Sequence, residues 1–425
     1  MLTIAASDPR APRRKSFLGS LARPLAFRIL GRLKNGQLLI QDPVGRRVVG
    51  RPTSATSDEP PFVEVADLGV YPRLLFGGSI GAAETYAKRR WSSSDLTSVI
   101  RVLARDQQVK ESLDGLLTRA AAAVHRRYHR RMTNTRRQSR HNIEAHYDLG
   151  NDFFGAFLDQ TMTYSCAIFP TPNATLEEAS IHKLDHICRK LDLQPTDELL
   201  EIGTGWGSLC LHAAAHYGCR VVTTTISTEQ HRCATARVRD AGLADRVSLL
   251  THDYRDLPGL LSRQFDKVVS VEMIEAVGQE FLPVFLDLYD RMLRPGGTAL
   301  IQAIVIADEL YDGYARGVDF IQRYIFPGGF LPSVAALRGI LTQRTSLEVS
   351  NVEDIAAHYP PTLRHWRRSL LARWDQLVVL GYPDELLRLW DFYFCYSEAG
   401  FLEGSVGDVQ LLLRKRPPNL SADRQ

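Results

Sequence analysis

The sequence predicts an α/β protein in which a doubly wound parallel sheet forms the main domain and a small α+β domain precedes it. Between residues 198 and 306, short apolar runs alternate with segments of helical periodicity. Strands that alternate with helices in this way form parallel sheets covered by helices on both faces. The chain has 425 residues, 44% hydrophobic and 24% charged, which suits a folded protein of two or three domains.

The N-terminal part is predicted to hold the small domain. Residues 1–20 are polar, basic and contain proline, so we expect them to be disordered. In residues 21–124, glycine and proline punctuate short apolar stretches, which indicates a small α+β domain. Within it we expect a β-hairpin, one strand and two helices, at residues 33–49, 62–66, 80–88 and 95–103.

A basic segment, residues 125–142, links the two domains and contains seven arginines and no acidic residue. One interpretation is a solvated linker. The other is a surface for anionic lipid, because each basic side chain near an anionic leaflet contributes about 1 kcal/mol. No recognition-helix or zinc-finger pattern lies nearby, so we expect no nucleic-acid partner. The arginines are Arg126, Arg127, Arg130, Arg131, Arg136, Arg137 and Arg140.

The main domain is predicted at residues 143–415, followed by a disordered tail at 416–425. Ligands of such sheets bind at the carboxyl ends of the strands, so the segments that follow the strands are candidate site segments. A helix is expected at 207–217, and Ser227 with Gln230 has the spacing of a capping box. The five strands are expected at residues 198–202, 220–226, 247–251, 265–271 and 298–306.

The first of these strands ends in a glycine-rich turn, Glu-Ile-Gly-Thr-Gly-Trp-Gly at 201–207. Glycines let the backbone approach a ligand closely, and the N-terminus of the following helix favours a carboxylate. S-adenosylmethionine (SAM) methyltransferases and dinucleotide folds share this pattern. The second strand lacks the acidic residue that binds ribose in dinucleotide folds, which disfavours NAD. We therefore expect a class I SAM-methyltransferase (Rossmann-like) fold, with Thr225 and Gln230 helping to bind SAM.

Cysteine spacing and hydropathy also predict the cellular compartment of the protein. The six cysteines lack paired metal-ligand spacing, so we expect reduced cytoplasmic thiols and no metal site. No apolar run reaches the roughly 18 residues that span a bilayer. The apolar stretch near the N-terminus is broken by Arg23, Pro24 and Arg28, so it makes a poor signal peptide. We expect a cytoplasmic protein that associates peripherally with the inner face of the membrane.

Further ordered motifs lie at residues 145–154, 162–167, 270–278, 324–329 and 358–363. Together with the glycine-rich turn, they resemble those of cyclopropane-fatty-acyl-phospholipid synthases and the related mycolic-acid and tuberculostearic-acid methyltransferases. The resemblance runs from about residue 140 to 414, and more weakly over the N-terminal domain, where it implies a role in lipid binding or dimer formation. It implies SAM-dependent transfer to the cis double bond of unsaturated acyl chains in membrane phospholipids, giving cyclopropane fatty acyl chains.

The resemblance also implies a catalytic site in which a bound bicarbonate acts as the base. Cys166, Glu275 and Tyr359 match site residues of the family. Gln302 stands where a histidine is usual, and it cannot take up a proton near neutral pH. Glu272 stands where glycine is usual, and its carboxylate could itself act as the base. This pair is similar to the branch that makes 10-methylene or methyl-branched chains, which is therefore the alternative product.

A set of residues on the strand rim is carried over for SAM, and Asp253 among them can accept a hydrogen bond from the adenine amino group. The aromatic runs at 324–330 and 390–396 would line an acyl tunnel, and a homodimer is implied. Two other classes stay open: an inactive protein that binds lipid and SAM, and a methyltransferase for a soluble small molecule. The SAM residues are Tyr164, Ser165, Glu201, Gly203, Gly205, Gly207, Thr225, Gln230, Asp253 and Tyr254.

Overall fold

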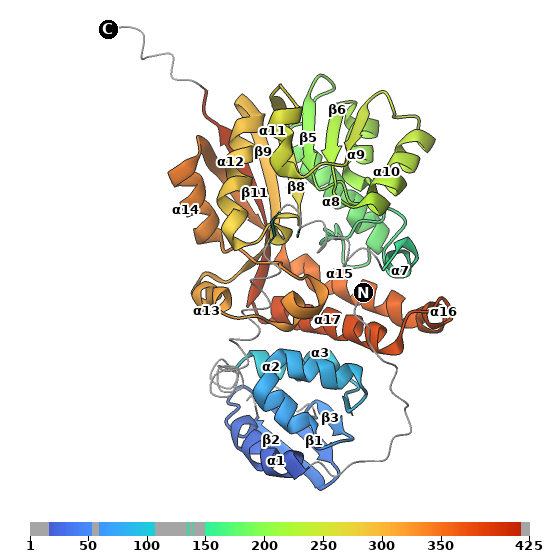
Figure 1. Cartoon of the computed structure of the whole chain (residues 1–425), viewed down its shortest axis with the longest axis vertical. Coiled ribbons are helices and arrows are strands. Elements are labelled where there is room, and N and C mark those ends of the chain that lie inside the picture. The colour runs from blue at the N-terminus through green and yellow to red at the C-terminus, as the bar shows by residue number, and fades with distance from the viewer. Residues whose placement is uncertain (1–16, 53–58, 107–133, 136–137, 139–148, 418–425) are drawn as a thin grey trace. The chain divides into compact units, whose positions relative to one another are not determined.

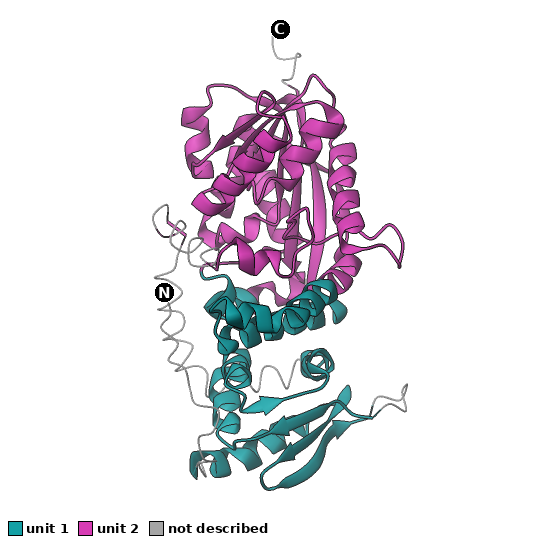
Figure 2. Cartoon of the chain, turned by 90° about the vertical axis from the view of Figure 1, so that its right-hand side faces the viewer, with its two compact units in different colours: residues 1–131, 314–327, 363–404 teal, residues 132–313, 328–362, 405–425 magenta. Residues whose placement is uncertain are grey.

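The computed structural model describes residues 17–52, 59–106, 134–135, 138 and 149–417. It divides into two compact units, each assembled from separated stretches of the chain (Figure 2). Unit 1 comprises residues 1–131, 314–327 and 363–404, and unit 2 comprises residues 132–313, 328–362 and 405–425. The seven arginines of the predicted basic linker lie outside the described residues.

The N-terminal part of unit 1 is a four-stranded sheet in the order β2-β1-β3-β4, with helices α1, α2 and α3 (Figure 1). The predicted hairpin is confirmed as β1 and β2, which pair antiparallel, and the predicted strand is confirmed as β3. Two boundaries were wrong. Helix α1 begins at Phe17, within the segment predicted to be disordered, and α2 begins at Val70 rather than near residue 80. A kink at Gly78, where φ is 50°, interrupts the periodicity of α2 and hid its first turns.

The elements of this part are α1 (Phe17–Leu30), β1 (Gly36–Asp42), β2 (Gly45–Arg51), β3 (Phe62–Val65), α2 (Val70–Ala87), β4 (Trp91–Ser92) and α3 (Leu96–Ala104).

Unit 1 also contains two segments that the sequence assigned to the catalytic domain. Helix α17 (Asp384–Leu402) packs against α2 and α3. Tyr86 of α2 donates a 2.6 Å hydrogen bond to Asp391 of α17, and its ring lies 5.7 Å from that of Phe392. Most of the aromatic run at 390–396 is buried in this helix packing, which explains its composition without a tunnel. The acyl tunnel stays a prediction. The other elements here are η6 (Ile321–Ile325), α15 (Tyr359–Ala372), which begins in unit 2, and α16 (Trp374–Val379).

Unit 2 is built on a seven-stranded sheet in the order β10-β11-β9-β8-β5-β6-β7. The five predicted strands are confirmed, and they pair in parallel. Two strands were missed: β11 inserts antiparallel between β9 and β10. The strands are β5 (Glu198–Ile202), β6 (Arg220–Thr224), β7 (Val247–Leu250), β8 (Phe265–Val271), β9 (Leu293–Ile306), β10 (Leu347–Asp354) and β11 (Val406–Lys415).

Helices cover this sheet, and two of them begin as their sequences dictate. Thr175 and Glu178 form a capping box at the start of α8. Ser227 caps α10 as predicted, but Gln230 does not complete the box, because its side-chain oxygen accepts from Thr225 instead. No helix in the described ranges is both long and apolar enough to cross a bilayer. The helices are α7 (Asn151–Gly155), α8 (Leu176–Lys190), α9 (Ser208–His212), η1 (Ala213–Tyr217), α10 (Thr228–Asp240), η2 (Tyr254–Asp256), α11 (Leu257–Leu260), η3 (Ile274–Ala276), η4 (Gln279–Phe281), α12 (Leu282–Met292), η5 (Asp308–Leu310), α13 (Tyr311–Ala315), α14 (Val334–Arg344) and η7 (Ala356–His358).

Candidate active site

The glycine-rich turn joins β5 to α9, and its backbone explains its glycines. Gly203, Gly205 and Gly207 have φ values of 100°, 52° and 90°, which side chains other than glycine rarely adopt. A Cβ at Gly203 would meet Met273 at 3.1 Å, and one at Gly207 would meet Ala234 at 3.2 Å. A Cβ at Gly205 would meet nothing within 4 Å. Open space over the centre of the turn fits a ligand such as SAM.

Polar side chains follow the next two strands, as predicted. After β6, Thr225 donates a 2.9 Å hydrogen bond to Gln230 Oε1, which fixes the orientation of that buried amide. After β7, both carboxylate oxygens of Asp253 accept from the guanidinium of Arg255, at 2.7 and 2.6 Å. A carboxylate has further lone pairs, so Asp253 remains able to accept from an adenine amino group. The ring of Tyr254 packs 5.3 Å from that of Phe285, which makes it a core residue of this unit.

Glu201 lies beneath the turn and is only 3% exposed. It accepts a 2.6 Å hydrogen bond from Thr223, whose hydroxyl also lies 2.7 Å from that of Thr204 in the turn. Burial raises the pKa of Glu201 to about 8, and the Thr223 bond opposes this rise. Glu201 therefore stabilises the glycine-rich turn through the hydroxyl groups of Thr223 and Thr204.

Tyr164 and Ser165 lie on the loop that follows α7. The Tyr164 ring packs 5.4 Å from that of Phe154. Ser165 accepts a 2.6 Å hydrogen bond from Lys183 Nζ, and Lys183 is only 1% exposed. Sequence reasoning missed this buried cation. Its signal was its position on the apolar face of α8, four residues after the buried Ala179 and four before the buried Ile187.

The Glu272 carboxylate is the centre of the candidate catalytic site. It follows β8 directly, with φ of 46°, a conformation that is uncommon outside glycine and clusters at functional sites. Oε1 accepts from the Cys166 backbone N–H at 2.7 Å and from Gln302 Nε2 at 2.8 Å. Oε2 accepts from the Tyr359 hydroxyl at 2.6 Å. Four of the predicted catalytic residues are therefore joined in one hydrogen-bonded cluster.

The register of β9 between its neighbours β8 and β11 determines the position of Gln302. It pairs with Val271 of β8 on one side and with Gln410 of β11 on the other. Its Nε2 also donates to Asp408 Oδ2 at 3.1 Å, and its Oε1 accepts from Gln410 Nε2 at 3.1 Å. All three side chains are fully buried, so the amide of Gln302 is locked with its nitrogen towards two carboxyl groups.

Asp408 and Gln410 were missed because no strand was predicted there. Their signal is visible in retrospect: an acid and an amide, two residues apart, interrupt the apolar stretch Val-Gly-Asp-Val-Gln-Leu-Leu-Leu at 406–413. Buried polar residues in a strand of this kind require partners, and those partners mark a site.

Glu275, the fifth predicted catalytic residue, lies one turn beyond Glu272 in η3. Its Oε1 accepts from the Ile304 backbone N–H at 2.5 Å, while its Oε2 is buried without a hydrogen-bond partner among the described residues. Burial, followed by the charge of Glu272, raises the pKa of Glu275 to about 8. An orphaned carboxylate oxygen suits a polar or cationic ligand.

Burial dominates the electrostatics of the cluster. It raises the pKa of Glu272, against hydrogen bonds from Tyr359 and Cys166 that lower it. It also raises the pKa of Asp408, and the charges of Glu272 and Glu275 add to that rise. Burial lowers the pKa of Lys183, which the charges of Glu272 and Asp408 partly restore. A positive charge in a bound substrate would lower the raised pKa values of these carboxyl groups, so the site favours such a substrate.

The Cys166 thiol is an unsuitable nucleophile. Burial raises its pKa well above the ordinary value, and the charges of Asp408 and Glu272 raise it further. Its Sγ lies 3.3 Å from the Ala167 carbonyl oxygen, as a donor. Cys166 therefore contributes its backbone N–H to the site rather than a thiolate. In the part of the chain that the structure describes, no group of three or more His, Cys, Asp or Glu side chains is arranged to hold a metal ion.

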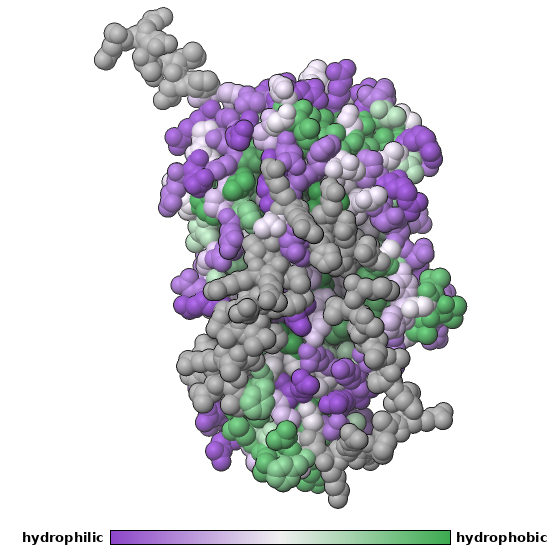
Figure 3. Space-filling model, in the orientation of Figure 1, coloured by the Kyte–Doolittle hydropathy of each residue, from purple (hydrophilic) through white to green (hydrophobic). Residues whose placement is uncertain are grey.

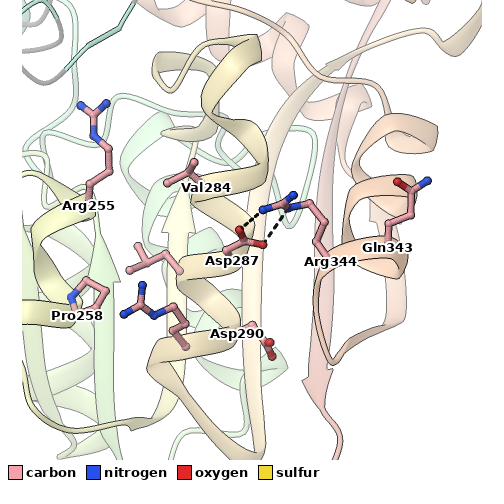
Figure 4. A pocket seen from close by; sticks show the side chains of 9 residues that line it. Arg255, Pro258, Val284, Asp287, Asp290, Gln343 and Arg344 are labelled. Carbon is pink, nitrogen blue, oxygen red and sulfur yellow. Dashed lines mark hydrogen bonds and ion pairs between the residues drawn. The ribbon is translucent and has the colours of Figure 1, made fainter.

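A surface groove of about 530 Å³ lies elsewhere on unit 2, between η2, α11, α12 and α14 (Figure 4). Its walls are charged, and across it Asp287 and Arg344 form an ion pair at 2.7 Å. None of the predicted site residues lines it. Its remaining lining residues are Arg255, Pro258, Val284, Leu288, Asp290, Arg291 and Gln343.

The strand order, the glycine turn and the polar rim define a class I SAM-dependent methyltransferase fold. The family model described as mycolic acid cyclopropane synthetase matches residues 134–411, and the chain belongs to this family.

Two relatives extend over most of the chain. Tuberculostearic acid methyltransferase UfaA1 of Mycobacterium tuberculosis is 43% identical over 351 residues, 80% of either chain. Cyclopropane-fatty-acyl-phospholipid synthase of Escherichia coli is 34% identical over 359 residues, covering 83% of this chain and 86% of the relative. Among solved structures, the mycolic acid cyclopropane synthase CmaA1, complexed with SAH and CTAB, matches with a TM-score of 0.60 and 31% identity over 65% of this chain and 98% of its own. The chain is thus a SAM-dependent methyltransferase of lipid acyl chains.

Proposed function

We propose that this protein transfers a methyl group from SAM to the cis double bond of an unsaturated acyl chain in a membrane phospholipid, and that the product is a methylene-branched chain. The observation that carries the proposal is the Glu272 carboxylate, which takes hydrogen bonds from Cys166, Tyr359 and Gln302. The relative with 43% identity, a tuberculostearic acid methyltransferase, supports the branched product.

The chemistry needs a base inside an anionic site. SAM supplies an electrophilic methyl group, and transfer to an alkene carbon leaves a cation on the neighbouring carbon of the acyl chain. The ionised Glu272 carboxylate provides negative charge near that cation, in a region where water screens little. A proton must then leave the added methyl carbon, and Glu272 is placed to accept it. Glu272 keeps some accessible surface, whereas Gln302 and Asp408 are fully buried behind it.

The two products differ by one step before that proton leaves. If the methyl carbon closes directly onto the cationic carbon as it loses the proton, a cyclopropane forms. If a hydride first moves from the methylated carbon to its neighbour, the cation becomes tertiary and loss of the methyl proton gives a methylene branch. The cyclopropane, which the sequence favoured, is the second candidate, supported by the Escherichia coli synthase and by the CmaA1 structure.

We propose further that bicarbonate is not needed as the base. The groups expected to hold it, the Cys166 N–H and the Tyr359 hydroxyl, both donate to Glu272. A second anion there would lie against Glu272 and the neighbouring Asp408 without a donor left from this set. In this proposal Glu272 supplies from the chain the base whose role the family resemblance assigns to bicarbonate.

A phospholipid substrate implies a peripheral association with the cytoplasmic face of the membrane, and we include it in the proposal. The test is to incubate the protein with vesicles of dioleoyl phospholipid and SAM carrying a trideuterated methyl group. We expect acyl chains that retain two deuterium atoms and whose ozonolysis reports a terminal methylene. Resistance to ozone with the same mass would identify the cyclopropane instead. SAM binding without any labelled chain would favour an inactive binding protein, and labelling of a soluble substrate alone would favour a small-molecule methyltransferase.

A further inference from the structure

Helix α1 exposes a row of large apolar side chains. Phe17, Leu18 and Leu21 are 78%, 68% and 62% exposed, and Leu25 is 39% exposed. At 100° per residue, these four positions and Arg28 fall on one side of the helix, within about a third of its circumference. Figure 3 shows hydrophobic surface at the lower end of the molecule, where Figure 1 draws α1.

This row is not the packing face of the helix. The opposite side of α1 carries its buried residues, which include Gly19, Ala26 and Phe27. That side lies so close to its neighbour that a Cβ at Gly19 would meet the Leu68 carbonyl oxygen at 2.6 Å. Because the inner face is already packed, the outer row contributes nothing to the core. Contiguous exposed apolar surface of this kind marks an interaction site.

The charge around the row is positive. No acidic residue occurs between Asp8 and Asp42. Arg28, one turn beyond Leu25 on the same side of α1, and Arg32, two residues past the end of the helix, are both exposed. Arg47 of β2 adds a third exposed guanidinium, 5.5 Å from the ring of Phe27. Apolar side chains flanked by arginines are typical of helices that lie in the plane of an anionic membrane surface.

We propose that the outer face of α1, defined by Phe17, Leu18, Leu21, Leu25 and Arg28, docks on an anionic phospholipid bilayer together with Arg32, which lies just beyond the helix. The apolar row enters the boundary between headgroups and acyl chains, and the arginines contact lipid phosphates. A second copy of the chain fits less well, since a two-fold interface through this face would bury Arg28, and no acidic residue between Asp8 and Asp42 is available on the partner face to pair with it. The inference rests on the proposed function, which makes a membrane phospholipid the substrate.

The first experiment compares Leu21→Glu with Leu260→Glu in the full-length protein. Leu260 of α11 is 49% exposed and serves as the matched control, a single exposed leucine of unit 2 outside this face. Binding is measured by sedimentation with vesicles of dioleoyl phosphatidylcholine and dioleoyl phosphatidylglycerol in equal parts. Turnover is measured on these vesicles and on the same lipids dispersed in non-ionic detergent micelles.

We expect Leu21→Glu to lose at least tenfold in vesicle binding and vesicle turnover, while micelle turnover and the melting temperature stay unchanged. Leu260→Glu should behave as the wild type. Arg28→Gln with Arg32→Gln should remove the preference for phosphatidylglycerol over phosphatidylcholine. If the Leu21→Glu variant still sediments with vesicles as the wild type does, the proposal is contradicted. The proposal is also contradicted if the only effect of the substitution is to dissociate a dimer in ultracentrifugation. If the wild type binds vesicles but modifies no lipid in either form, the proposed function fails and the docking surface stands.

Discussion

The hydroxyl of Tyr359 donates a 2.6 Å hydrogen bond to Oε2 of Glu272, so the first residue of α15 is tied to the residue that follows β8. On the other oxygen, Glu272 accepts from the Cys166 backbone and from Gln302. Donors from three separate stretches of the chain thus converge on one carboxylate. That convergence orients Glu272 before the substrate arrives, as preorganised catalysis requires.

Replacing the Glu272 carboxylate should remove the catalytic base while the protein still folds. Glu272→Gln keeps the shape of the side chain but cannot accept a proton, so we expect turnover to fall by about 10²–10⁴-fold while SAM binding persists. The measurement is single-turnover methyl transfer, with calorimetric SAM binding as the control. A variant with turnover near the wild type would remove Glu272 from the mechanism.

Glu272→Gly tests whether bicarbonate can replace the carboxylate. Glycine also relieves the positive φ at this position, so the variant should fold. It frees the donors of Cys166 and Tyr359, and we expect added bicarbonate to restore part of its turnover. The wild type, compared in parallel after removal of dissolved carbon dioxide, should be insensitive to bicarbonate. Bicarbonate dependence of the wild type would contradict the proposal.

Asp408→Asn should change the pH dependence of turnover. Burial raises the pKa of Asp408 and of Glu272, so we expect turnover to be lost as pH falls through this raised range. Asparagine keeps an oxygen for Gln302 but carries no charge and no competing acid. Glu272 then ionises more readily, and we expect the acid limb of the pH–rate profile to move down by about one unit. An unmoved limb would show that Asp408 only supports Gln302.

The sequence predicted those parts of the site that depend on residues close together in the chain. The turn at Gly203–Gly207 and the polar residues after β6 and β7 follow directly from strand ends, so their shared rim could be predicted. Asp408 and Gln410 depend on β11, which inserts between β9 and β10 from far along the chain. The register that places them beside Gln302 is a tertiary property, and no local pattern fixes it. Segment 363–404 joined unit 1 for the same reason, through packing of α17 on α2 and α3, and segment 314–327 joined it through packing of η6 on α17.

The enzyme should remain active when the Cys166 thiol is replaced. The group that reaches Glu272 is the backbone N–H, and burial with nearby negative charge raises the thiol pKa. We expect Cys166→Ser to keep turnover within about tenfold of the wild type and the wild-type thiol to resist alkylation at neutral pH. Rapid alkylation of Cys166 with loss of activity, read by peptide mass spectrometry, would refute this assignment. Cys233, which is half-buried, is the internal comparison.

Gly205→Ala should weaken SAM binding more than it weakens the fold. At Gly205 φ is 52° and an added Cβ meets no protein atom within 4 Å, so the methyl group would project into the space assigned to SAM. Gly242 is the matched control, since its φ is 68° and a Cβ there also meets nothing within 4 Å, but it follows α10 away from the turn. Both variants should lose about 1 kcal/mol of stability from backbone strain. If SAM lies over the turn, only Gly205→Ala loses SAM affinity in calorimetry, and equal affinities in the two variants would place SAM elsewhere.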